Sequence, residues 1–168
     1  MSQPGGDLTV DIIAGYVKWL AQQMPTNPKG DPPRVVPVTF SHPGDRVVGS
    51  AAVWVGDWFG QFIIHSLRAG VRRRVLEGWF ELIAAAQFDG PTLTGAVIQD
   101  GLDYQVARLV YDCFHVWDLD IATEEHLQQS ETVDLAWTIQ NEVQRGPTAN
   151  GTGIRLTSRV GFRTRYID

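Results

Sequence analysis

The chain has 168 residues, of which 43% are apolar and 20% charged, and its formal net charge is −5. These proportions are close to globular averages, so they exclude wholesale disorder and predict a single domain over 1–168 with a sizeable core. A pI of about 5.3 argues against a general nucleic-acid binder, which would be basic. A lone cysteine, Cys113, excludes an intrachain disulfide.

The sequence shows no targeting or membrane-spanning pattern. Its first residues, MSQPGGDLTV, lack the basic and apolar regions of a signal peptide, and no apolar run reaches the roughly 18 residues of a membrane span. We therefore expect a protein of the cytoplasm, at least where it is made.

The first predicted element is a helix over 7–24. Ile12, Tyr16 and Leu20 recur at four-residue spacing, which is typical of one helix face. The prolines of the segment 25–33 cannot continue a helix, so this segment is predicted to be a short Pro-rich connection.

Three strands are predicted next, over 34–40, 46–58 and 59–67, because these stretches are β-branched and partly alternating. The stretch 71–87 fits both a helix and a strand: apolar residues share a face in either conformation. Periodicity alone leaves these two alternatives open.

The second half is predicted as an excursion, a strand, a helix and a final strand. Glycine–proline and aspartate–glycine pairs predict an inserted hairpin or loop over 88–104. A long strand follows over 105–119, then a helix over 122–146 and a closing strand over 153–168. The order predicts an α+β domain: a mainly antiparallel sheet with two helices packed on one face, plus an extended hairpin or arm.

The segment CFHVWDLD contains the residue types of two kinds of site. On a strand, Cys113 and His115 would share a face, as a cysteine nucleophile and its base must. Asp118 and Asp120 would share the other face, where carboxylate oxygens could hold a cation. We favour the alternative of a buried cysteine and strand-ending aspartates. Zinc-ligand spacings and glycine-rich phosphate loops are absent from the sequence, so we expect neither a structural zinc site nor a phosphate-binding loop.

The closing strand carries a face of arginines in an acidic chain. Successive side chains of a strand point to opposite faces, so the arginines gather on one side and apolar residues on the other. These arginines are Arg155, Arg159, Arg163 and Arg165. Acidic residues on and around the predicted second helix are candidate counterparts: Glu124, Glu125, Glu131, Asp134 and Glu142.

Two explanations of the arginine face stay open. The arginines could make weak surface pairs within one subunit, or the basic strand of one copy could meet the acidic helix of the next. Arg72 and Arg74, in the basic run GVRRRV, could contact phosphate, although a solvated face or a subunit contact is more typical. Trp58 is a further candidate for an interface, since aromatic residues are enriched there.

Three short motifs lie in the first half of the chain: VTFSHPG at Val38–Gly44, VWVGD at Val53–Asp57, and the stretch Arg73–Phe80. They resemble the VxYGxPG, VWVGD and R-R-x-x-E-x-F segments of the tail terminator (neck) proteins of long-tailed actinobacterial phages. A phenylalanine and a serine replace the tyrosine and glycine of the first segment. The second half resembles the family only in its order of elements, with 88–104 as an insertion.

The resemblance implies a structural virion protein, six copies of which form a ring. The ring would end the tail tube and join it to the head connector, with the tail tube protein and the head completion (stopper) protein as partners. Genomic DNA would pass through its lumen, and no catalysis, cofactor or membrane would be involved. The resemblance also implies that 71–87 is a strand, and that the arginine face holds neighbouring subunits together or docks the ring on an acidic partner.

Two other functions stay open at this point. One is another head–tail connector or a tail-tube-like subunit. The other is a small-ligand-binding or hydrolytic α+β domain built around Cys113, His115 and Asp118, for which these groups would have to converge on a concave pocket.

Overall fold

The computed structural model describes residues 4–28, 33–44, 51–68, 71–90, 92–123, 126, 127, 133, 135–147 and 151–167. The elements, in chain order, are helix α1 (Pro4–Leu20), strands β1 (Thr26–Asn27), β2 (Arg34–Val35), β3 (Val38–Thr39), β4 (Ala51–Arg68) and β5 (Val71–Asp89), the 3-10 helix η2 (Gly95–Asp100), helix α2 (Leu102–Thr123), and strands β6 (Leu135–Pro147) and β7 (Gly151–Ile167). This is the α+β class that the sequence predicted.

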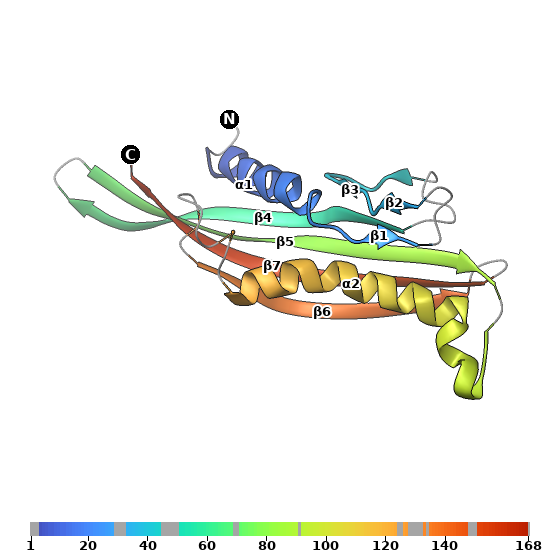
Figure 1. Ribbon diagram of the computed structural model, residues 1–168. Coiled ribbons are helices and arrows are strands. Elements are labelled where there is room, and N and C mark those ends of the chain that lie inside the picture. Colours follow the sequence, from blue (N-terminus) through green and yellow to red (C-terminus); the bar gives the residue numbers. More distant parts are fainter. Residues whose placement is uncertain are drawn as a thin grey trace.

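Five strands form the main sheet in the order β3-β4-β5-β7-β6 (Figure 1). All neighbours are antiparallel except β3 and β4, and β1 pairs with β2 in a separate small sheet. The long strands β4 and β5 form a hairpin whose tip extends past both helices, and the end of β7 accompanies it (Figure 1). The sheet is therefore longer than the core that it covers.

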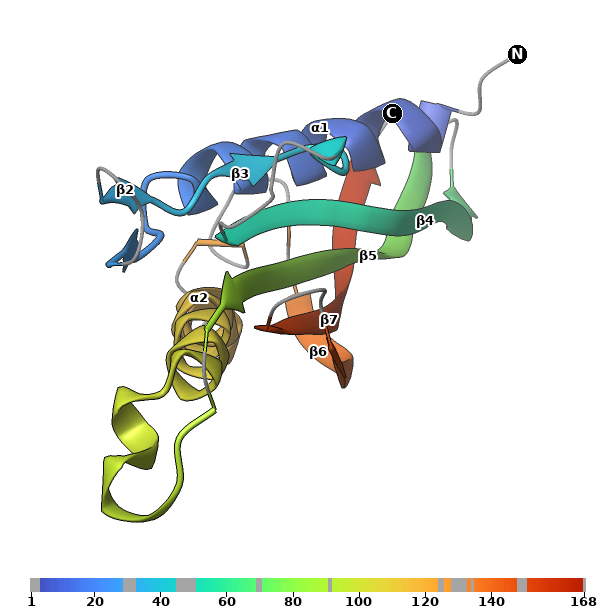
Figure 2. The same ribbon diagram turned by 90° about the vertical axis from the view of Figure 1, so that its right-hand side faces the viewer.

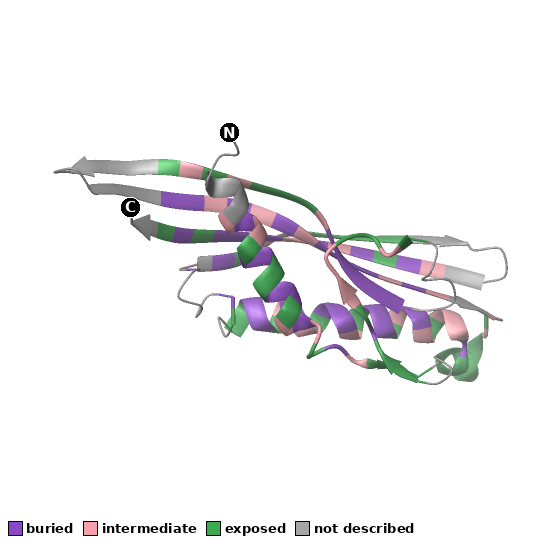
Figure 3. Ribbon diagram, turned by 90° about the horizontal axis from the view of Figure 1, so that it is seen from above, coloured by how far each residue is buried: buried purple, intermediate pink, exposed green. Residues whose placement is uncertain are grey.

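The core lies between the two helices and one face of the sheet (Figures 1 and 2). Each helix turns a buried apolar side toward that face, which we call the inner face (Figure 3). Leu76, Phe80, Val160 and Phe162 of the sheet are fully buried there. Burying such a side chain stabilises the fold by about 1.5–3 kcal/mol. The core thus holds the sheet by one side and leaves the other side, the outer face, without a covering helix among the described residues.

Three of the predicted elements are confirmed. The opening helix was expected over 7–24 and is α1, after which the chain turns through 21–23 ahead of the prolines. The stretch 71–87 is a strand, part of β5, as the resemblance implied. The closing strand is β7, and its apolar and arginine faces are separated as predicted.

Two long elements were predicted in the wrong conformation. Residues 105–119, expected as a strand, lie within helix α2. Residues 135–147, expected as the end of a helix over 122–146, form the edge strand β6. The buried residues of α2 recur at three- and four-residue spacing and pack on the inner face. Burying this apolar side favours a helix over the strand that the alternating pattern suggested.

Two boundaries also differ from the prediction. The strands expected over 46–58 and 59–67 are continuous from residue 51 as β4. The excursion 88–104 is no hairpin where it is described: it contains the end of β5, η2 and the first residues of α2. Of the Pro-rich connection 25–33, residues 29–32 lie outside the described residues.

Candidate protein interface

The outer face is built from the odd-numbered residues of β5 and β7, because inner and outer side chains alternate along each strand. Antiparallel pairing sets Glu81 opposite Arg159 and Glu77 opposite Arg163. An Nη2 atom of Arg159 lies 3.1 Å from Oε1 of Glu81, and Arg163 forms an ion pair with Glu77. Two of the predicted arginines are therefore paired within the chain, with glutamates of the neighbouring strand.

A row of aromatic side chains crosses the sheet between these two ion pairs. Phe59 of β4 is opposite Trp79 of β5, and their rings stack with centroids 6.4 Å apart. Gly161 of β7 is opposite both Trp79 and Trp137 of β6. Phe59 is 46% exposed and Trp137 38% exposed, so the row presents apolar surface to solvent.

Gly161 makes room for the ring of Trp137. A Cβ atom at this position would lie 2.5 Å from Cε2 of Trp137, closer than real Cβ atoms approach any atom. The indole therefore lies over the glycine backbone. Phe59, Trp79, Trp137 and Arg163 line a pocket of about 230 Å³ at this place. We call Phe59, Trp79 and Trp137 the aromatic row.

Tryptophan rings also hold two of the arginines. The guanidinium carbon of Arg159 lies 3.9 Å from the ring centroid of Trp79, and that of Arg155 lies 5.6 Å from that of Trp54. A guanidinium over an indole is attracted by the negative face of the ring, by about 0.5–1 kcal/mol at exposed sites. The arginines are thereby held flat along the outer face.

The other predicted interface residues lie in several places. Arg155 and Arg165 are exposed on β7. Trp58 is in β4, where it is opposite Phe80 on the inner side and packs edge-on against Phe40. Arg72 and Arg74 belong to β5, but their side chains lie outside the described residues.

The second half of the predicted acidic helix is the strand β6. Glu124, Glu131 and Asp134 lie outside the described residues. The acidic partners that sequence reasoning missed are Glu77 and Glu81. A signal for them was present: Glu77, Trp79 and Glu81 alternate in a strand, and their spacing matches Arg163, Gly161 and Arg159 in antiparallel order.

The arrangement proposed for a cysteine nucleophile is wrong. Cys113 and His115 are two residues apart on a helix, so the thiol is buried against the core and the imidazole is exposed. Burial, with a smaller effect of Asp112, raises the pKa of the Cys113 thiol to about 12. A reactive thiol needs a lowered pKa and access to solvent, and this thiol has neither.

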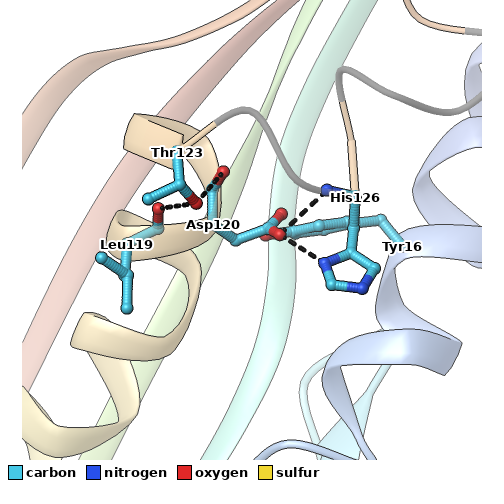
Figure 4. A network of polar contacts seen from close by, with 5 residues as sticks. All are labelled: Tyr16, Leu119, Asp120, Thr123 and His126. Atoms are coloured by element: carbon cyan, nitrogen blue, oxygen red, sulfur yellow. Dashed lines mark hydrogen bonds and ion pairs between the residues drawn. The ribbon is translucent and has the colours of Figure 1, made fainter.

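Asp120 instead joins a buried network that the sequence did not indicate (Figure 4). Its carboxylate, 4% exposed, accepts a hydrogen bond of 3.0 Å from the Tyr16 hydroxyl and one of 3.0 Å from the backbone N–H of His126. Nδ1 of His126 lies 2.7 Å from the same carboxylate. Burial and the Asp120 carboxylate raise the pKa of Tyr16 far above its ordinary value.

This network ties the two helices together. Tyr16 belongs to α1 and Asp120 to the last turn of α2, while the ring of His126 stacks on Trp19 at 4.2 Å. A pocket of about 310 Å³ lies beside Tyr16, Trp19 and His126. Thr123, drawn beside the network in Figure 4, donates to the Leu119 carbonyl. We interpret the network as structural, because every polar contact described for it joins one part of the fold to another.

Within the described residues, His, Cys, Asp and Glu side chains form no group of three or more that could hold a metal ion. None of the described helices combines the length and the apolar character needed to cross a membrane. A comparison with protein-family models finds no match, and a comparison with curated proteins finds none either.

Proposed function

We propose that the chain is a structural, ring-forming subunit of a phage neck. In this function a ring of copies, six by the resemblance of its motifs, ends the tail tube and joins it to the head connector. The tail tube protein lies on one side of the ring and the head completion (stopper) protein on the other. Genomic DNA passes through the lumen.

The observation that carries this proposal is the outer face. Its centre is an aromatic row that is partly exposed, and its flanks are ion pairs between β5 and β7. Protein interfaces have this composition, with an aromatic and apolar centre inside a polar rim that excludes water. The exposed rings have no covering element among the described residues, so a second protein surface is the natural partner.

The pairing of the arginines favours a protein partner over DNA. Phosphate contacts require cations that are free to release counterions, whereas Arg159 and Arg163 already bond to Glu81 and Glu77. The glutamates would also repel the phosphates. We therefore assign the outer face to subunit contacts and not to the wall of the DNA channel.

The length of the sheet is consistent with an assembly subunit. The tip of the β4–β5 hairpin and the end of β7 project past the helices, as an arm that reaches a neighbour would (Figure 1). Strands that project beyond the core offer edge backbone groups with which another chain can pair.

The test is native mass spectrometry over a range of concentrations, followed by negative-stain imaging with and without purified tail tubes. We expect closed rings alone, or rings that form on the tube ends. Phe59→Thr with Trp137→Thr should abolish the rings and leave a folded monomer, because threonine keeps the strand propensity and removes the aromatic surface. Val143→Thr, at an exposed residue on the inner side of β6, is the matched control.

Two results would contradict the proposal. A wild-type chain that stays monomeric and never binds tube ends would remove the neck function. Rings that fit inside the tube wall instead of on its end would favour the tail-tube-like alternative. Reversing the charge of Arg159 or Arg163 is a poorer test, since it would place like charges opposite each other within one chain.

A further inference from the structure

Helix α2 has a second surface that its own sheet does not use. Opposite its buried side, side chains at three- and four-residue spacing form an exposed stripe. Its large members are Tyr104, Tyr111 and Leu119, the last of which is 65% exposed. We call this surface the α2 stripe. A two-sided helix of this kind is typical of one that packs on a sheet by one side and on a partner by the other.

The α2 stripe and the outer face present charged groups of different kinds, carboxylates beside the first and guanidinium groups on the second. Two carboxylates, Asp112 and Asp118, lie beside the α2 stripe. The one arginine of α2 is Arg108, whose Nε atom lies 3.3 Å from Oδ1 of Asp112. The outer face instead presents the arginines of β7. Arg159 and Arg163 pair with Glu81 and Glu77, and Arg155 lies exposed over the ring of Trp54. A basic aromatic surface and an acidic tyrosine-bearing surface are complementary.

We propose that the outer face of one copy docks on the α2 stripe of the next copy. This inference rests on the proposed function, because it assumes that the chain assembles with itself. The two surfaces lie on opposite sides of one sheet, so the contact is head-to-tail: each copy offers its outer face to one neighbour and its α2 stripe to the other. Such a contact closes into a ring when the rotation between copies permits.

The charges argue against the symmetric alternative. If two outer faces met, the β7 arginines of one copy would lie near those of the other, with no acidic helix between them, and like charges near each other across an interface oppose binding. Two α2 stripes would likewise bring Asp112 and Asp118 of each copy together. The head-to-tail contact places the arginines of β7 near the carboxylates of α2.

A complementation experiment tests the pairing. The first variant, Phe59→Thr with Trp137→Thr, loses the outer face and keeps the α2 stripe. The second, Tyr111→Ala with Leu119→Ala, loses the α2 stripe and keeps the outer face. Each should self-associate at least about 30-fold more weakly than wild type, as expected for loss of one interface hot spot. An equimolar mixture should form a one-to-one heterodimer, because the intact outer face of the second variant can still dock on the intact α2 stripe of the first. No larger assembly should form.

The outcomes separate this inference from the proposed function. Wild-type rings together with a mixture that stays monomeric would overturn the head-to-tail pairing and leave the neck function standing. A wild type that never assembles, even with tail tubes, would overturn both. Circular dichroism checks that each variant is folded. If the first variant unfolds, Phe59→Thr alone replaces it, since that side chain is nearly half exposed and its loss leaves the core intact.

Discussion

Gly161 decides whether the aromatic row can form. The residue lies between Trp79 and Trp137 in the register of the sheet, and the indole of Trp137 occupies the space where a side chain would be. A residue with a Cβ atom would displace the ring from the strand. The outer face therefore depends on the absence of one methyl group as much as on the presence of the aromatics.

Gly161→Ala should lower the free energy of unfolding by about 1–3 kcal/mol, the usual cost of overpacking. The measurement is urea denaturation, with near-UV circular dichroism to detect movement of the indole. Gly15→Ala is the matched control: a Cβ at this helical position would meet no atom within 4 Å, so the change should stabilise the protein by up to about 1 kcal/mol. Equal effects of the two changes would contradict the packing assigned to Trp137.

Cys113 should make the protein sensitive to alkali. The pKa of its thiol is about 12 in the folded chain and near 9 when unfolded, so the folded state holds the proton more tightly. The stabilisation is complete below pH about 9 and is lost as the pH rises toward 12, by up to about 1.4 kcal/mol per pH unit. Denaturation curves between pH 8 and about 10 should show this slope, since Tyr16 begins to contribute only above about 10.

The control for this slope is Cys113→Val, which keeps an apolar side chain and removes the proton. Its stability should be flat over the same interval. The thiol should also react with Ellman's reagent at pH 8 at least about 100-fold more slowly in the folded chain than in urea, because only an opened state exposes it. Rapid reaction of the folded protein would show that the thiol is not buried.

The positions of side chains were predicted correctly where they depend only on the conformation of a single strand. Alternation along one strand was enough to separate the arginines of β7 from its apolar residues, and no knowledge of neighbours was needed. The partners of those arginines depend on which strands pair and in what register. Glu77 and Glu81 lie about 80 residues earlier in the chain, and with 71–87 open between helix and strand their alignment with Arg163 and Arg159 was hidden.

At the scale of the element, the errors have one cause. The segment that became α2 satisfies both periodicities: its odd-numbered residues are mostly apolar, and so is its helical stripe. Such a segment takes the conformation that its surroundings bury best. In β6, Leu135, Ile139 and Val143 imitate a helix face, but a bulge between Thr138 and Gln140 shifts the alternation of the strand. A bulge of this kind leaves no simple trace in sequence.

The Tyr16–Asp120 bond should hold the two helices together energetically. Asp120→Ala leaves the buried Tyr16 hydroxyl without this acceptor, so it should cost about 2–4 kcal/mol, whereas Tyr16→Phe should cost about 1 kcal/mol. The double variant should cost less than the sum, because neither buried group is then left without a partner. Thermal or urea denaturation of the four proteins completes the cycle. Additive losses would mean that the two side chains do not interact in solution.

At the scale of the molecule, the fold divides one small domain into two working surfaces. The main core uses the inner face of the sheet and one side of α2, and a smaller buried cluster of Ala52, Trp54 and Ile83 occupies one end of the outer face. The aromatic row and the α2 stripe lie outside both clusters and on opposite sides of the sheet. A monomeric binding protein would gain little from two such surfaces. A ring subunit needs both, because every copy has a neighbour on each side.

Because each copy uses one surface for each neighbour, a variant that lacks one surface should inhibit ring formation by the wild-type protein. In a closed ring each copy makes two joints, so one copy lacking its α2 stripe breaks one joint and prevents closure. If variant Tyr111→Ala with Leu119→Ala is mixed with wild type at a variant fraction f, intact rings should fall as (1 − f) raised to the number of subunits. For six subunits, a variant fraction of about one tenth should leave about half of the rings.

Native mass spectrometry of mixtures prepared before assembly gives this dependence directly. The logarithm of the intact-ring yield, plotted against the logarithm of the wild-type fraction, should be a straight line whose slope is the number of subunits in the ring. The control variant Val143→Thr should enter rings freely and give a slope of zero. A slope near one for the α2 variant would mean that joints fail independently and that the α2 stripe does not close the ring.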